Sequence, residues 1–128
     1  MKRLLKSSCI VLLAALFFVL AGCSSEPDVK ADYDTVHDAV AAYKGGTDIT
    51  GKKIKVKASM DSAAGVIYSI PDMEVRANVT VTIITNDSNR NEVLSIKEDD
   101  IVVVKAEMVD NHLVNSVYIF ATEYQLVK

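Results

Sequence analysis

The chain has 128 residues, a formal net charge of −3 at pH 7 and 50% hydrophobic residues, with 17 acidic and 14 basic side chains. This length suits one small domain with a core of its own rather than several domains. An acidic chain is a poor candidate for wrapping nucleic acid, because that affinity comes mostly from phosphates neutralised by lysine and arginine.

The first 22 residues have the pattern of an export signal. Lys2, Arg3 and Lys6 form a positive start, and residues 9–20 contain no polar side chain. This apolar run is too short for a membrane-spanning helix, which needs about 20 residues, but its length and flanks are typical of a secretory signal. We therefore predict that residues 1–22 are a removable signal peptide.

The end of this segment, Leu20-Ala21-Gly22-Cys23, resembles the lipobox of bacterial lipoproteins. The resemblance implies that the Cys23 thiol receives a diacylglyceryl group and that cleavage occurs before Cys23, after which the new amine is available for a third acyl chain. Two acyl chains hold a protein durably on a membrane. The expected location is extracytoplasmic, on the cell membrane of a Gram-positive cell or the outer membrane of a Gram-negative one. The alternatives are an ordinary secretory signal and an uncleaved anchor.

Cleavage changes the charge and the cysteine count of the chain. Three basic residues leave with the signal, so 11 basic side chains face 17 acidic ones, a net charge of −6. Cys9 is removed and Cys23 carries lipid, which leaves no thiol for a disulfide. We interpret residues 23–31 as a lipidated tether and residues 32–128 as the folded domain.

Residues 32–44 are predicted to form an amphipathic helix, because apolar and aromatic residues recur at helical spacing: Tyr33, Val36, Val40 and Tyr43. Asp32 or Asp34 would cap its start. Lys44 suits its negative end, and Gly45-Gly46 would stop it.

Beyond Gly51 the apolar period changes from 3.6 to 2, which is typical of half-buried strands. Five runs carry this pattern: residues 54–60, 65–70, 75–85, 101–108 and 113–127, the last bending near residues 121–123. Residues 86–91 are polar and are predicted to be a loop. Because no connection contains a helical crossover, we expect antiparallel pairing throughout.

Residues 51–56, which open the first run, and residues 97–104, which open the fourth, look like the small bacterial lipoproteins that have an OB-fold of the tRNA-anticodon-binding type. The resemblance implies a mainly β domain: an N-terminal helix plus a five-stranded antiparallel OB-like barrel, with no established activity. The pattern of elements also fits a cystatin-like α+β arrangement, in which a helix leads into an antiparallel sheet.

A row of lysines is the first candidate ligand site: Lys52, Lys53, Lys55 and Lys57. Concentrated positive charge in an acidic domain can attract a phosphate, an anionic polymer or an acidic protein. The alternative interpretation is a solvated strand face that protects the sheet from aggregation.

Aromatic residues form the second candidate: Tyr68, Tyr118, Phe120 and Tyr124. Tyr118 and Phe120 share one face of the fifth run, and aromatic rings on OB domains can stack on bases or sugars. The alternative is that this row packs in the core or against the helix.

Calcium is considered because Asp87, Asn89, Asn91 and Glu98 have the spacing of a calcium loop. However, Glu92 stands where the sharp turn of such a loop needs glycine, so a plain polar loop is the preferred interpretation. We expect no metal and no cofactor.

Catalysis has no motif to support it. His37 and His112 are the only histidines, and neither stands in a recognisable catalytic pattern. We therefore expect a non-enzymatic binding or interaction module, with the membrane and an envelope protein as partners. The alternative function is an OB domain that binds an oligonucleotide or an anionic cell-envelope polymer.

Overall fold

The computed structural model describes residues 30–127 of the chain. The predicted signal peptide, Cys23 and most of the tether lie outside these residues. The described elements are, in chain order, α2 (Val36–Lys44), β1 (Lys53–Lys57), β2 (Val66–Asp72), β3 (Ala77–Ile83), α3 (Arg90–Leu94), β4 (Ile101–Lys105), β5 (Met108–Asp110), β6 (Ser116–Ala121) and β7 (Glu123–Val127). Neither described helix is long and apolar enough to cross a membrane.

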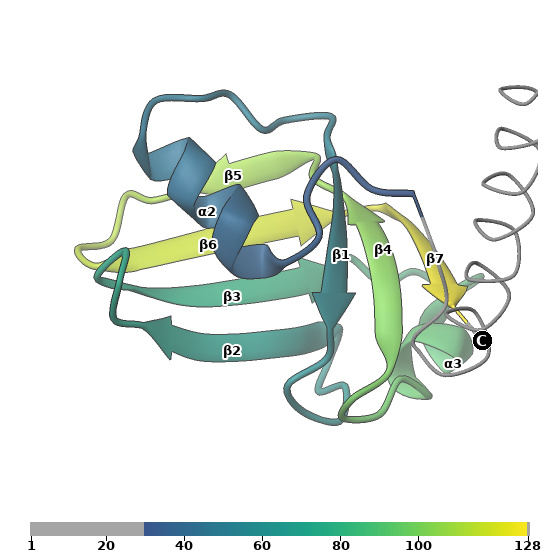
Figure 1. Ribbon diagram of the computed structural model, residues 1–128. Coiled ribbons are helices and arrows are strands. Elements are labelled where there is room, and N and C mark those ends of the chain that lie inside the picture. Colours follow the sequence, from purple (N-terminus) through teal and green to yellow (C-terminus); the bar gives the residue numbers. More distant parts are fainter. Residues whose placement is uncertain (1–29, 128) are drawn as a thin grey trace, which may run out of the picture.

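The strands form two sheets that cross each other (Figure 1). One has three antiparallel strands in the order β1-β4-β7. The other has four strands in the order β2-β3-β6-β5, in which β3 and β6 run parallel and the other pairs antiparallel. Helix α2 lies across the four-stranded sheet beside β1 (Figure 1).

The core fills the space between the sheets and α2. Alternate residues of β3 are buried, among them Val79, Val81 and Ile83. Ile119 of β6 is fully buried in the same cluster. Helix α2 adds Val36, Ala39 and Val40 to the same cluster. Full burial of each valine or isoleucine side chain contributes about 1.5–3 kcal/mol, which is the main stabilisation available to a domain without disulfides.

The helix begins later than residues 32–44 predict, so the proposed caps Asp32 and Asp34 are wrong. Its N-cap is Thr35, whose Oγ1 accepts a hydrogen bond from the backbone N–H of Asp38 at 3.0 Å. Asp32 instead accepts the backbone N–H of Lys53 at 2.8 Å, and Tyr33 forms a parallel bridge with Ile54. The segment before Thr35 is therefore extended along the edge of β1.

A mainly β fold with an N-terminal helix is confirmed, whereas five wholly antiparallel strands are wrong. The fourth run breaks at residues 106–107 and the fifth at Thr122, which gives seven strands and no closed barrel within residues 30–127. The parallel pair was missed because β3 and β6 are not consecutive: residues 84–115 supply the long connection that parallel strands need. Two sheets with a parallel pair also differ from the single antiparallel sheet of the cystatin-like alternative.

Helix α3 replaces part of the predicted polar loop. The side-chain oxygen of Asn86 accepts the backbone N–H groups of Ser88 and Asn89 at 2.8 and 3.0 Å, which forms the turn that leads into the helix. Val93 of α3 is fully buried and fixes the helix to the core. A single buried residue is too weak a periodic signal for sequence analysis to detect.

Candidate functional site

The lysine face is the outward surface of the β1-β4-β7 sheet. Because Ile54 and Val56 of β1 point into the core, the alternate residues Lys53, Lys55 and Lys57 point outward. On β4 their partners in register are Lys105, Val103 and Ile101. The sequence candidates Lys53, Lys55 and Lys57 thus share one face.

Lys52 is exposed but precedes β1, and it is out of phase with the outward positions 53, 55 and 57. Its carbonyl accepts the backbone N–H of Ala106 at 2.9 Å. Asp48 lies nearby, where hydrogen bonds from Thr50 and, to a smaller extent, the charge of Lys52 lower the pKa of its carboxyl. Lys52 therefore stands beside the row rather than within it.

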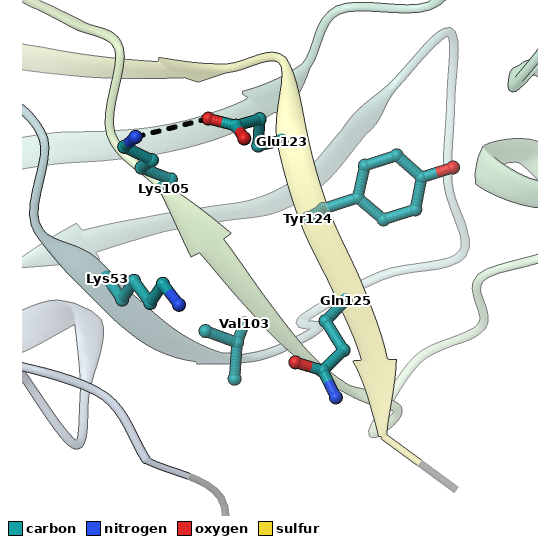
Figure 2. A pocket seen from close by; sticks show the side chains of 6 residues that line it. All are labelled: Lys53, Val103, Lys105, Glu123, Tyr124 and Gln125. Atoms are coloured by element: carbon teal, nitrogen blue, oxygen red, sulfur yellow. Dashed lines mark ion pairs between the residues drawn. The ribbon is translucent and has the colours of Figure 1, made fainter.

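A groove of about 280 Å³ opens at one end of the lysine face (Figure 2). Val103 lines it although this side chain is only 4% exposed, and Lys53 and Lys105 stand around it. Lys105 forms an ion pair with Glu123 at 3.2 Å. The groove combines an apolar floor with ammonium groups, a lining that suits an anion with an apolar part.

A second groove of about 290 Å³ lies at the other end of the face, between β1 and the start of α2. Its lining includes Lys55, Lys57, Ile101 and Tyr68. Burial and, less strongly, the charge of Asp72 raise the pKa of the Tyr68 hydroxyl, which therefore stays protonated at neutral pH. Tyr68 thus lies beside Lys55 and Lys57, whereas Tyr124 lines the first groove with Lys53 and Lys105.

His37 joins α2 to the turn between β2 and β3. Its Nδ1 lies 2.6 Å from Asp72 Oδ2 and its Nε2 lies 2.8 Å from Glu74 Oε1. The hydrogen bond to Asp72, helped by the charges of both carboxylates, raises the pKa of His37. Burial opposes ionisation of Asp72, yet its bonds from His37 and from backbone N–H groups outweigh that effect and lower its pKa. With both ring nitrogens engaged, His37 acts as a structural clamp.

The aromatic face is the outward surface of β3, β6 and β5. Val117, Ile119 and Ala121 are buried in the core, so Tyr118 and Phe120 point the other way and are half-buried. Their rings stack with centroids 6.3 Å apart and planes 18° apart. Cross-strand neighbours of the pair are Thr80, Thr82, Met108 and Asp110.

Exposed apolar residues also lie at the turns that begin β3 and β6. Met73 and Val114 are 84% and 85% exposed, and Leu113 is 49% exposed. The backbone N–H of Asn78 donates to the carbonyl of Asn115 at 2.8 Å, which holds the two turns side by side. Sequence analysis missed these residues. Their signal was apolar side chains in segments where turn chemistry favours polar ones.

The candidate lysines and the pair Tyr118 and Phe120 lie on different sheets. The lysines lie on the three-stranded sheet, and the stacked pair Tyr118 and Phe120 lies on the four-stranded sheet. The lysine row and this aromatic pair therefore form two separate candidate surfaces.

Within residues 30–127, no group of three or more histidine, cysteine or acidic side chains is arranged to hold a metal ion. Residues with the calcium spacing serve other roles: Asp87 pairs with Arg90 at 3.3 Å and Asn91 belongs to α3. His112 is exposed and hydrogen-bonded to Asp110 at 2.5 Å. The backbone N–H of His112, together with this side-chain bond, lowers the pKa of Asp110.

Comparison with known proteins gave no significant match to any family model, curated protein or solved structure.

Proposed function

We propose that the chain is a bacterial lipoprotein, anchored outside the cytoplasm through Cys23, whose domain is a non-enzymatic binding module. The support for the anchor is the order of features at the start of the chain: a positive segment, a short apolar run and the Leu20-Ala21-Gly22-Cys23 pattern. Cys23→Ser tests it. We expect this variant to lose the mass of the lipid and to leave the membrane fraction. A variant that remains there would contradict the anchor.

We also propose that the domain is a variant of the OB fold. We take β4 and β5 as one bent strand, and β6 and β7 as another. The order of hydrogen-bonded strands is then β1, β4/β5, β6/β7, β3 and β2. The backbone N–H of Ser59, after β1, donates to the carbonyl of Ile67 in β2 at 2.9 Å. That contact brings β1 and β2, the two ends of this strand order, close together. The proposal rests on this order of pairing and on the parallel β3-β6 pair.

Of the surfaces described, the aromatic face best supports binding of an envelope protein or a small ligand. The observation that carries this proposal is the stacked pair Tyr118–Phe120 on an outward surface, with Met108 51% exposed opposite Phe120. Two rigid rings beside a flexible methionine present apolar contact area at a small cost in side-chain entropy. The exposed residues Met73 and Val114 lie in the turns that begin β3 and β6, at one end of the same sheet.

The test uses a photo-crosslinking residue at Val114 of the full-length chain in living cells, with Lys97 as the control position. We expect a defined adduct from Val114 that disappears in the double variant Tyr118→Ala, Phe120→Ala, and no such adduct from Lys97. Adducts that survive the double variant would show that the aromatic pair is not the binding surface.

The alternative function is binding of an oligonucleotide or an anionic cell-envelope polymer. It is favoured by Lys53, Lys55 and Lys57 sharing one face. The net charge of −6 after signal cleavage weighs against it, because the rest of the domain repels a long polyanion. Salt-sensitive binding of a soluble polyanion to this face would favour the alternative.

A further inference from the structure

We propose that the lysine face lies against anionic phospholipid headgroups of the membrane that holds Cys23, so that the aromatic face points away from the membrane. This inference rests on the lipid anchor proposed above. Neither the anchor nor the binding module by itself sets how the domain is oriented.

The first argument is where the chain enters the domain. The backbone N–H groups of Asp32 and Tyr33 both donate to the carbonyl of Lys53, at 2.8 and 3.1 Å. Figure 1 shows the first described residues passing beside the upper ends of β1 and β4. Lys30 is the seventh residue after Cys23, and seven residue steps span at most about 25 Å. The Lys53 end of the sheet is therefore held close to the lipid.

The second argument is the separation of charge. On the three strands, the outward positions carry Lys53, Lys55, Lys57 and Lys105 against one acidic residue, Glu123. The chain after signal cleavage has a net charge of −6, so the remaining surface is strongly acidic. An anionic bilayer attracts the first surface and repels the second, which orients the domain without requiring strong binding.

The third argument is what lies between the charges. The outward positions at the centre of the sheet are Val103 and Ile101, 4% and 9% exposed, rather than acidic residues. The lysine ammonium groups can reach headgroup phosphates on flexible stems while the apolar centre carries no charge to desolvate. The opposing charges beside the face are Glu123, which pairs with Lys105, Asp34 at the edge of the second groove, and Asp32, whose Oδ2 accepts the backbone N–H of Lys53 at 2.8 Å.

The experiment uses the lipidated chain in vesicles of neutral phosphatidylcholine, with or without about 30% phosphatidylglycerol, and measures acetylation of each lysine by mass spectrometry. We expect Lys53 and Lys57 to react several-fold more slowly on the anionic vesicles, and high salt to abolish the difference. Lys44 and Lys97, exposed residues outside the face, serve as internal controls and should react equally on both.

A matched pair of variants tests the mechanism. Lys53→Gln with Lys57→Gln should remove the protection of Lys105, because each lysine contributes roughly fivefold to attraction by an anionic surface. Lys44→Gln with Lys97→Gln removes the same net charge elsewhere and should leave that protection intact. Equal loss in both pairs would overturn the inference.

Other outcomes are equally decisive. Equal acetylation on both vesicle types, or equal protection of all lysines, would overturn the orientation while leaving the anchor in place. Protection by a soluble polyanion on neutral vesicles, but not by anionic vesicles, would assign the face to a polymer instead. A chain that floats with neither vesicle type would overturn the lipid anchor itself, and the inference with it.

Discussion

Gly65, in the connection between β1 and β2, is the position where one added methyl group should do the most measurable damage. Its φ is +94°, and a Cβ there would stand 2.2 Å from the carbonyl oxygen of Ile83. Gly46 provides a matched control, since its φ is +104° and nothing lies within 4 Å of the added atom. Both alanine variants adopt left-handed backbone, but only Gly65→Ala must displace another segment.

The two costs can be worked out from these contacts. Left-handed backbone costs an alanine about 1 kcal/mol, which is the whole effect expected for Gly46→Ala. In Gly65→Ala the Ile83 carbonyl must also move, which disrupts the hydrogen bond from the Ile83 N–H to the Gly65 carbonyl at 2.8 Å. With about 1 kcal/mol for that bond and a similar strain, the expected total is about 3 kcal/mol.

The assay is urea unfolding of a chain beginning at Ser24, followed by circular dichroism. We expect Gly65→Ala to lower the free energy of unfolding by about 2 kcal/mol more than Gly46→Ala, with an unchanged dependence on urea. For a domain of this size, 2 kcal/mol corresponds to a difference of about 10 °C in Tm. Equal losses, within about 0.5 kcal/mol, would refute the clash with Ile83 as the cause.

Three further predictions concern side chains. His37→Gln should destabilise the domain most near pH 5–6. The ion pairs of His37 are fully effective below its ordinary pKa of about 6.5, and their contribution is lost as the pH rises through the raised pKa of the folded state. The lowered pKa of Asp72 keeps its part effective until strongly acidic pH, so unfolding measured across pH should show a difference that shrinks toward pH 9. Tyr124→Phe should remove the tyrosine that titrates at about 12 in ultraviolet absorbance, since burial and Glu92 raise that pKa, and should cost about 1 kcal/mol. Ile119→Ala, at a fully buried position, should cost about 2–5 kcal/mol in the same urea assay. A cost below 1 kcal/mol would contradict its place in the core.

The strands that alternate cleanly were predictable from sequence. In β3, Val79 and Val81 alternate with Thr80 and Thr82, and the burial follows that alternation. A bend near residues 121–123 was also predicted, and the structure divides the run into β6 and β7 at that point. What the pattern lacks is information about partners: period 2 shows which residues share a face, but does not show which strand lies alongside.

The site was predictable to the same extent. Alternation placed Lys55 and Lys57 on one outward face and Tyr118 with Phe120 on another. Whether those faces belong to the same sheet depends on pairing between residues far apart in the sequence, which no local pattern contains. The predicted start of α2 was wrong for a related reason. Its helical spacing included Tyr33, but a long-range bridge to Ile54 holds this residue in extended backbone.

The parallel pairing of β3 with β6 has a consequence for when the chain can fold. Asn78 pairs with Ser116, and the residues between them include α3, β4 and β5. Contacts between distant residues form slowly, because loop closure must precede any gain from them. During synthesis, the first half of the domain therefore cannot complete its core until residues 116–121 have emerged. A chain that has not folded during synthesis is also a suitable substrate for the export proposed above. Under that proposal, the domain folds after it has crossed the membrane.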